Sequence, residues 1–129
     1  MIYLADTVAL IHHLRNRRKL SNLAETILQA ADRGEHTILL SAVTLMEILY
    51  LGQANRIPLS LNDLLAAVDG SDNYRIIPLD KHIIATAQTI DDVPELHDRM
   101  IVATAVYHQA PILTPDHIIK ASQHIKAIW

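Results

Sequence analysis

Short apolar runs alternate with segments of helical periodicity along the whole chain, and this alternation restricts the fold more than any other feature. The apolar runs predict strands at 2–5, 37–40, 74–77 and 112–113, with a candidate fifth strand at 127–129. The segments between them predict helices at 7–14, 23–31, 43–50, 60–68, 82–87, 97–108 and 118–122. Strands that alternate with helices indicate a parallel sheet covered on both faces. We therefore expect a single α/β domain over residues 1–129, with four to five parallel strands and helices on both faces of the sheet.

Four acidic residues follow the predicted strands or lie on the helices after them: Asp6, Glu47, Asp98 and Asp116. Parallel strands end along one edge of a sheet, where open α/β folds bind their ligands, so these side chains are expected to converge. Two carboxylates about 4 Å apart repel each other by roughly 4 kcal/mol at an effective dielectric near 20. Such a pocket needs protons or cations at neutral pH, and its oxygen ligands favour Mg²⁺ or Mn²⁺.

Each of the four acids also has an ordinary structural role open to it. Asp6 and Asp116 stand where an aspartate caps the following helix. Asp98 lies in the first turn of its helix, where the helix dipole favours a carboxylate. Glu47 has the alternative of facing solvent on an amphipathic helix. Capping and exposure do not explain why all four acids occupy equivalent places in one alternating pattern.

A basic segment closes the first predicted helix. The formal net charge of −3 does not indicate a strongly basic nucleic-acid binder, but net charge hides local clusters. One interpretation is that an RNA backbone lies along this segment. The other is a solvated helix end, favoured by the dipole at a helix C-terminus. The segment contains His12 and His13 and the four candidate RNA-binding residues Arg15, Arg17, Arg18 and Lys19.

Composition limits the class of protein. Hydrophobic residues make up 50% of the chain, with a mean hydropathy of +0.18, which indicates a dense core or an apolar face covered by another subunit. No apolar stretch reaches the roughly 18 residues of a membrane span. The first apolar segment is interrupted by Asp6 and followed by the basic residues, unlike a signal peptide. Without cysteine there is no disulfide and no Cys-ligated metal site. We expect a cytoplasmic protein.

Other chemistry-bearing residues are given lesser roles. The eight histidines include no H-E-x-x-H pair, so a zinc protease site is excluded. His97 and His117 adjoin two of the acids and are candidates for the rim of the site. The sequence also lacks a Walker loop and the motifs G-x-G-x-x-G and G-x-S-x-G, which argues against nucleotide-dependent, dinucleotide-linked and serine-hydrolase chemistry. A solvated loop is expected for Asp91, Asp92 and Glu95.

Four segments of the chain resemble the PIN-domain nucleases, and most closely the VapC-type toxins of prokaryotic toxin–antitoxin pairs. These segments are YLADT, SAVTLMEI, PELHDRMIVATA and ILTPD. The resemblance implies a PIN-like fold in which the four acids bind Mg²⁺ or Mn²⁺. It matches Thr7 and Thr114 to hydroxyl positions that bond a carboxylate or water, and Arg99 to an arginine that either contacts substrate or packs locally. It further implies a homodimer and a small antitoxin partner, without membrane association.

The expected activity is metal-dependent endoribonuclease cleavage. A metal-bound water would attack the phosphodiester and leave 5′-phosphate and 3′-hydroxyl ends. The basic segment would bind the RNA backbone without reading its sequence. Two alternatives stay open: a non-catalytic PIN-like module for RNA binding or assembly, and a structure-specific DNA nuclease that uses the same acids.

Overall fold

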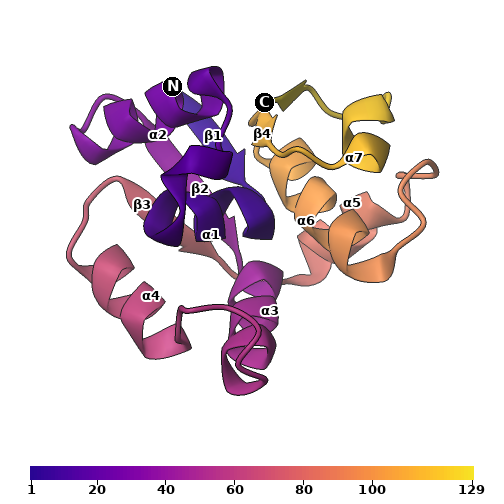
Figure 1. Ribbon diagram of the computed structural model, residues 1–129. Helices are drawn as coiled ribbons and strands as arrows, with labels where there is room; N and C mark the ends of the chain where they lie inside the picture. The colour runs from indigo at the N-terminus through magenta and orange to yellow at the C-terminus, as the bar shows by residue number, and fades with distance from the viewer.

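The computed structural model describes residues 1–129 and contains one five-stranded sheet in which all neighbouring strands are parallel. The strand order is β3-β2-β1-β4-β5 (Figure 1). The candidate fifth strand is present at one edge of the sheet, so the predicted α/β class and strand number are confirmed. The strands are β1 Ile2–Ala5, β2 Thr37–Ser41, β3 Tyr74–Ile77, β4 Ile112–Leu113 and β5 Ala127–Ile128.

Seven α-helices connect and follow the strands. They are α1 Thr7–Arg15, α2 Asn22–Asp32, α3 Ala42–Gln53, α4 Leu61–Asp69, α5 Lys81–Ala87, α6 Leu96–Tyr107 and α7 His117–Ala121. A short 3₁₀ helix that the sequence pattern did not predict, Arg17–Lys19, follows α1. None of the helices has the length and apolarity needed to cross a lipid bilayer.

The sheet divides the core into two apolar clusters because alternate residues of a strand point to opposite faces. Tyr3 and Ala5 pack with side chains of α1, α2 and α4, whereas Leu4 packs with side chains of α5, α6 and α7. Figure 1 shows the same division, with α1, α2 and α4 on the left and α5, α6 and α7 on the right. The expectation of helices on both faces is confirmed.

Serine residues cap three of the helices. The Ser21 hydroxyl accepts a hydrogen bond from the Ala24 N–H, and Ser41 and Ser60 do the same for α3 and α4. These bonds satisfy backbone N–H groups that have no partner inside the helix. Each of these helices therefore begins at a defined residue, which fixes where the following side chains point.

The order of strands brings two distant parts of the chain together. β1 lies between β2 and β4, and Ala5 of β1 is paired with Leu113 of β4. The Asp6 N–H donates a 3.1 Å hydrogen bond to the Leu113 carbonyl. Asp6 and Thr114 consequently leave the sheet side by side, and α3 starts directly after β2 at the same edge.

Candidate active site

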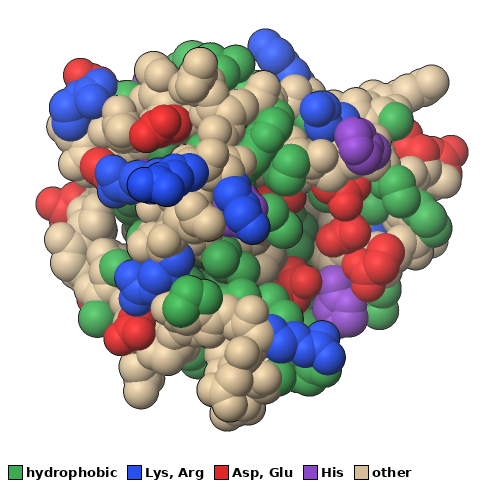
Figure 2. All heavy atoms as spheres, viewed as in Figure 1, with side chains coloured by type: hydrophobic (Ala, Val, Ile, Leu, Met, Phe, Trp, Pro, Cys, Tyr) green, Lys and Arg blue, Asp and Glu red, His purple; other side chains and the backbone are tan.

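The four acids predicted from the sequence line one small pocket at this edge of the sheet. Its cavity volume is about 180 Å³. Asp6 comes from the β1–α1 junction, Glu47 from α3, Asp98 from α6 and Asp116 from the β4–α7 junction. In Figure 2 acidic side chains gather in the right half of the view, between the α1 side and the α6 side of the molecule. The other residues around the pocket are Thr7, Val8, Ile101 and Pro115.

Asp6 is the most buried of the four acids, with 6% of its surface exposed. One carboxylate oxygen accepts a 2.8 Å hydrogen bond from the Ala9 N–H and so caps α1, and the other accepts a hydrogen bond from the Thr114 hydroxyl. Burial, with a smaller contribution from the negative charges of Asp116 and Glu47, raises the pKa of Asp6 to about 6, although the two hydrogen bonds oppose the rise. Asp6 is thus a helix cap and a wall of the pocket at once.

Asp116 likewise both caps a helix, α7, and lines the pocket. Its Oδ1 atom accepts hydrogen bonds of 2.9 and 3.0 Å from the N–H groups of Ile118 and Ile119. Its own N–H donates to the Thr114 hydroxyl oxygen at 3.0 Å. Because capping occupies one oxygen, the second oxygen stays available to the pocket. The capping role seen in the sequence and the convergence of the acids are therefore compatible.

Asp98 lies in the first turn of α6 but does not cap it. The cap of α6 is Glu95, which accepts a 2.7 Å hydrogen bond from the Asp98 N–H. The Asp98 side chain is half-buried and turned to the pocket instead. Burial raises its pKa to about 6, with further contributions from Glu95 and from the other three acids of the pocket.

Glu47 is not a solvent-facing side chain of α3. It is partly buried, and its Oε1 atom accepts a 2.7 Å hydrogen bond from the Thr7 hydroxyl. The Thr7 oxygen also lies 3.1 Å from the hydroxyl of Thr44, a fully buried residue of α3. Thr7 and Thr114 thus each contact a carboxylate. The sequence analysis did not identify Thr44, whose signal is only a hydroxyl inside an apolar helix.

Arg99 and His97 lie outside the pocket lining. The Arg99 guanidinium donates to the carbonyls of Val93 and Pro94, at 2.9 and 2.7 Å, so it holds the loop before α6. His97 pairs with Glu95 at 2.8 Å, and that hydrogen bond raises the pKa of His97. His117 is exposed at the start of α7. Of the two roles open to Arg99, the structure contains the local one.

The acidic loop before α6 is not simply solvated, which corrects the sequence interpretation. Asp92 accepts hydrogen bonds of 2.8 Å from the Ser122 hydroxyl and the Gln123 N–H, and Asp91 contacts His124 at 2.9 Å. The ligand atoms of Asp91, Asp92 and His124 lie within 4.8 Å of one another, a close spacing that the four acids of the pocket do not reach as a group of three. These contacts fasten the loop to the chain after α7.

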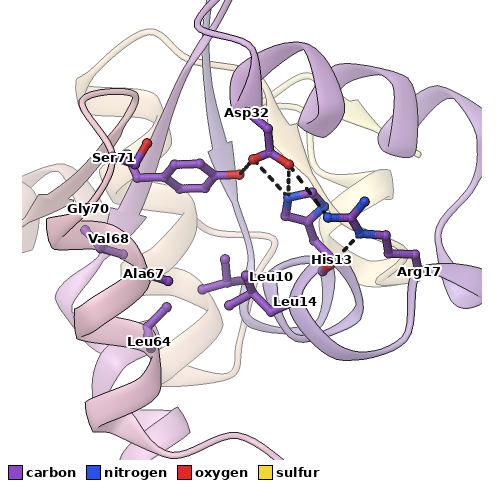
Figure 3. Close-up of a pocket in the computed structure, with 11 residues that line it drawn as sticks. Leu10, His13, Leu14, Arg17, Asp32, Leu64, Ala67, Val68, Gly70 and Ser71 are labelled. Atoms are coloured by element: carbon purple, nitrogen blue, oxygen red, sulfur yellow. Dashed lines mark hydrogen bonds and ion pairs between the residues drawn. The ribbon is translucent and has the colours of Figure 1, made fainter.

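Two of the four candidate RNA-binding side chains form contacts within the protein, and the other two do not. Arg15 donates to the Pro58 carbonyl at 2.7 Å, and Arg17 donates to the His13 carbonyl at 3.1 Å and faces Asp32 at 3.8 Å (Figure 3). Arg18 and Lys19 are exposed and form no ion pair or side-chain hydrogen bond. In Figure 2 most basic side chains on the visible face lie on its left half, interspersed with acids, whereas a group of neighbouring acidic side chains lies on the right half.

The residues around the pocket fit a hard divalent cation. All four potential ligand groups are carboxylates, and no nitrogen or sulfur ligand lines the cavity. Burial, and to a smaller extent the neighbouring carboxylates, raise the pKa of Asp6 and Asp98, and no cationic side chain lines the pocket to compensate the negative charge. A divalent ion would supply that compensation. The wider spacing of the carboxylates leaves an ion room to draw them together.

Three solved structures illustrate the similarity of fold. A chain of the VapBC2 complex from Rickettsia felis, bound to a promoter DNA fragment, superposes with a TM-score of 0.72 at 15% identity, covering 100% of this chain and 99% of that one. DNA-bound VapBC from Salmonella typhimurium gives 0.70 at 17% identity, covering 99% and 97%. FitAcB from Neisseria gonorrhoeae gives 0.69 at 24% identity, covering 100% and 97%.

The sequence itself matches a known family over most of its length. Among curated proteins none matches significantly. The sequence profile of the PIN domain, however, matches residues 3–123, a range that includes all four acids of the pocket. The profile and the fold agree, and this chain belongs to the PIN domain family.

Proposed function

We propose that this protein is a metal-dependent endoribonuclease and the toxin of a toxin–antitoxin pair. The observation that carries the proposal is the convergence of four carboxylates from four elements on one pocket of about 180 Å³. Membership of the PIN family supports nuclease chemistry. The solved neighbours include a toxin–antitoxin complex from Klebsiella pneumoniae, which supports the toxin assignment.

Asp6, Glu47, Asp98 and Asp116 would hold Mg²⁺ or Mn²⁺. When bound, the ion lowers the pKa of a coordinated water and so provides a nucleophile for the phosphodiester. The protein's own contribution is to hold its carboxylates in place. Asp6 is fixed by the Ala9 N–H and the Thr114 hydroxyl, and Glu47 is fixed by the Thr7 hydroxyl. Fixed ligands lose little freedom when ion and substrate bind.

The RNA path would start at the basic segment. Asp6 and Arg15 are nine residues apart on α1, and a helix rises about 1.5 Å per residue. The segment therefore lies roughly 14 Å from the acids along α1, a distance that a bound strand of a few nucleotides spans. Arg18 and Lys19 have no intramolecular partner, so we assign the phosphate contacts to them before Arg15 and Arg17.

The proposed partners are a small antitoxin and a second copy of the chain, in the cytoplasm. Large apolar side chains are exposed on α3, with 48% of Met46, 39% of Leu49 and 60% of Tyr50 accessible. Leu79 and Ile84, at and near α5, are also exposed. Exposed apolar side chains of this size favour burial against another protein surface.

Cleavage assays test the proposal. Purified protein is incubated with single-stranded RNA, duplex DNA and flapped DNA, in EDTA or with Mg²⁺ or Mn²⁺. We expect RNA cleavage only with metal, and products with 5′-phosphate and 3′-hydroxyl ends. Undiminished cleavage in EDTA with 2′,3′-cyclic phosphate ends refutes the metal-water mechanism. Cleavage of flapped DNA alone indicates the DNA nuclease, and RNA binding without cleavage indicates the non-catalytic module.

An acid outside the pocket provides the control for the cleavage assay. Asp116→Asn keeps a capping oxygen at the start of α7 and removes one charge from the pocket. Asp63→Asn makes the same chemical change on the exposed surface of α4. We expect only Asp116→Asn to abolish cleavage. Equal activity of both variants would show that the pocket is not the active site.

A further inference from the structure

Thr44 carries a buried hydroxyl that packing does not explain. The residue lies in the first turn of α3 and has no exposed surface. Valine has nearly the same shape and would fill the space without burying a polar group, which is costly unless that group is hydrogen-bonded. The Thr44 hydroxyl has one side-chain partner, the Thr7 hydroxyl at 3.1 Å. Any role of the Thr44 hydroxyl must therefore act through Thr7.

The number of available protons sets the direction of the hydrogen bonds. The Thr7 hydroxyl has a single proton, and two acceptors lie within reach, Glu47 Oε1 at 2.7 Å and Thr44 Oγ1 at 3.1 Å. An ionised carboxylate can only accept, and bonds to it are the shorter and stronger ones. Thr7 therefore donates to Glu47, and Thr44 donates to Thr7. The result is a chain of hydroxyls from Thr44 through Thr7 to Glu47, in which each bond polarises and strengthens the next.

This chain crosses between two helices. Thr44 and Glu47 are three residues apart on α3 and so lie on the same side of the helix, and Thr7 begins α1. A hydroxyl rotates freely unless a donor or acceptor fixes it. Without a proton from Thr44, the Thr7 hydroxyl is held less firmly in the orientation in which it donates to Glu47. Glu47, which has several rotatable bonds, then loses its one side-chain hydrogen bond in the preferred orientation.

The opposite wall of the pocket has the same construction. The Thr114 hydroxyl donates to Asp6, and the Thr114 oxygen accepts the Asp116 N–H at 3.0 Å. Two acids of the pocket are thus each held by a buried threonine, and each threonine is held by a further donor. At the Asp6 wall that donor is a backbone N–H, and at the Glu47 wall it is the side chain of Thr44.

We propose that Thr44 is a positioning residue of this site: it orients the Thr7 hydroxyl so that Glu47 faces the acidic pocket. The inference rests on the proposed function of that pocket. It assigns Thr44 no contact with metal or RNA. The effect of Thr44 reaches the chemistry only through the orientation of the Glu47 carboxylate.

Three variants of the full chain test the proposal. Thr44→Val removes the hydroxyl and keeps the shape, and Thr44→Ser restores a hydroxyl. Thr104→Val is the matched control, since Thr104 is equally buried and its hydroxyl bonds a carbonyl of its own helix α6 at 2.8 Å. The measurements are Mn²⁺ affinity of the protein without RNA, kcat and KM for RNA cleavage, and NMR relaxation of the Glu47 side chain in metal-free protein.

The expected results separate positioning from packing. Loss of one hydrogen bond of ordinary strength predicts Mn²⁺ affinity and kcat about three- to tenfold lower in Thr44→Val, with KM unchanged. The Glu47 side chain should become more mobile, and Thr44→Ser should restore Mn²⁺ affinity, kcat and the mobility of Glu47 to wild-type values. Thr104→Val should resemble wild type. Thermal stability in EDTA should not fall in Thr44→Val, because the valine buries no polar group.

A double variant shows whether Thr44 acts through Glu47. In a Glu47→Gln background, adding Thr44→Val should change Mn²⁺ affinity no further, since the residue through which it acts is already altered. An equal loss in both backgrounds overturns the proposal, as does unchanged Glu47 mobility in Thr44→Val. If wild type neither binds Mn²⁺ nor cleaves RNA, the proposed function fails, and Glu47 mobility still decides the positioning role.

Discussion

Replacing Asp98 by asparagine should remove activity without reducing the stability of the metal-free protein. The fold raises the pKa of this carboxyl from 3.8 to about 6. Two units correspond to about 3 kcal/mol of unfavourable ionisation at neutral pH, since one unit is worth about 1.4 kcal/mol. Asp98 is only half-buried, so we reduce this figure to about 1 to 2 kcal/mol for screening by water.

The helix dipole acts in the opposite direction. Asp98 stands at the third position of α6, where a carboxylate contributes about 0.3 to 1 kcal/mol. Its side chain caps no N–H group, so no further stabilising contact is lost. The net expectation for Asp98→Asn in EDTA at pH 7.5 is a gain of about 0 to 1.7 kcal/mol, or a melting temperature higher by roughly 7 °C at most.

The control for Asp98→Asn is an aspartate at the same position of another helix that has no other carboxylates beside it. Asp63 is the third residue of α4, behind the cap Ser60, and its side chain meets only Arg15, at 3.5 Å. Asp63→Asn loses the dipole contribution and this exposed ion pair, so it should be slightly less stable than wild type. Denaturant or thermal unfolding of both variants, with and without Mg²⁺, measures the difference.

The stability difference between Asp98→Asn and wild type should change with pH in a definite direction. Because the folded-state pKa of Asp98 is raised, its contribution to wild-type stability is fully present below about 3.8 and is lost as pH rises through about 6. Asp98→Asn should therefore match wild type at pH 4 and exceed it at pH 7.5. Mg²⁺ should stabilise wild type more than the variant, because it binds the folded wild-type site. A loss above 1 kcal/mol in EDTA, or equal stabilisation of both proteins by Mg²⁺, would refute the reasoning.

Three further predictions concern RNA binding, toxicity and the buried histidine. Neutralising Arg18 and Lys19 should weaken RNA binding and flatten its dependence on salt with metal binding intact, and an unchanged salt slope would place the RNA path elsewhere. Expression of wild type should arrest bacterial growth, whereas Asp6→Asn, which keeps a capping oxygen, should not; a toxic Asp6→Asn would show that the site is misassigned. Burial lowers the pKa of His13, which contacts Asp32, so stability should fall below pH 6.5 in wild type relative to His13→Gln, and a gap that does not depend on pH would contradict this.

The sequence predicted the strands well because strands covered on both faces appear as continuous apolar runs. Tyr3 and Leu4 face opposite sides of the sheet, and both are buried. The convergence of Asp6 and Asp116 followed from the parallel arrangement, since both acids follow neighbouring parallel strands. These predictions required only local patterns and one general property of parallel sheets.

Contacts between distant positions were not predictable in the same way. Glu95 follows a proline in a polar stretch and was assigned to a solvated loop, but it caps α6. Asp92 bonds a residue 30 positions away, and Thr44 meets Thr7 across 37 positions. A hydroxyl inside an apolar helix gives no sign of its partner. Only the packed structure shows which polar groups meet there.

The hydrogen bond between Thr114 and Asp6 spans 108 positions of the chain. A ribosome builds the chain from its amino end, so Asp6 and Glu47 emerge long before Asp98, Thr114 and Asp116. A nascent chain that stops at residue 113 has only part of the acidic pocket and lacks the Thr114 hydroxyl that holds Asp6. The site can assemble only when β4 has taken its place beside β1, after nearly the whole domain has been synthesised. Under the proposed function, the active site is therefore incomplete until synthesis of the domain is nearly finished.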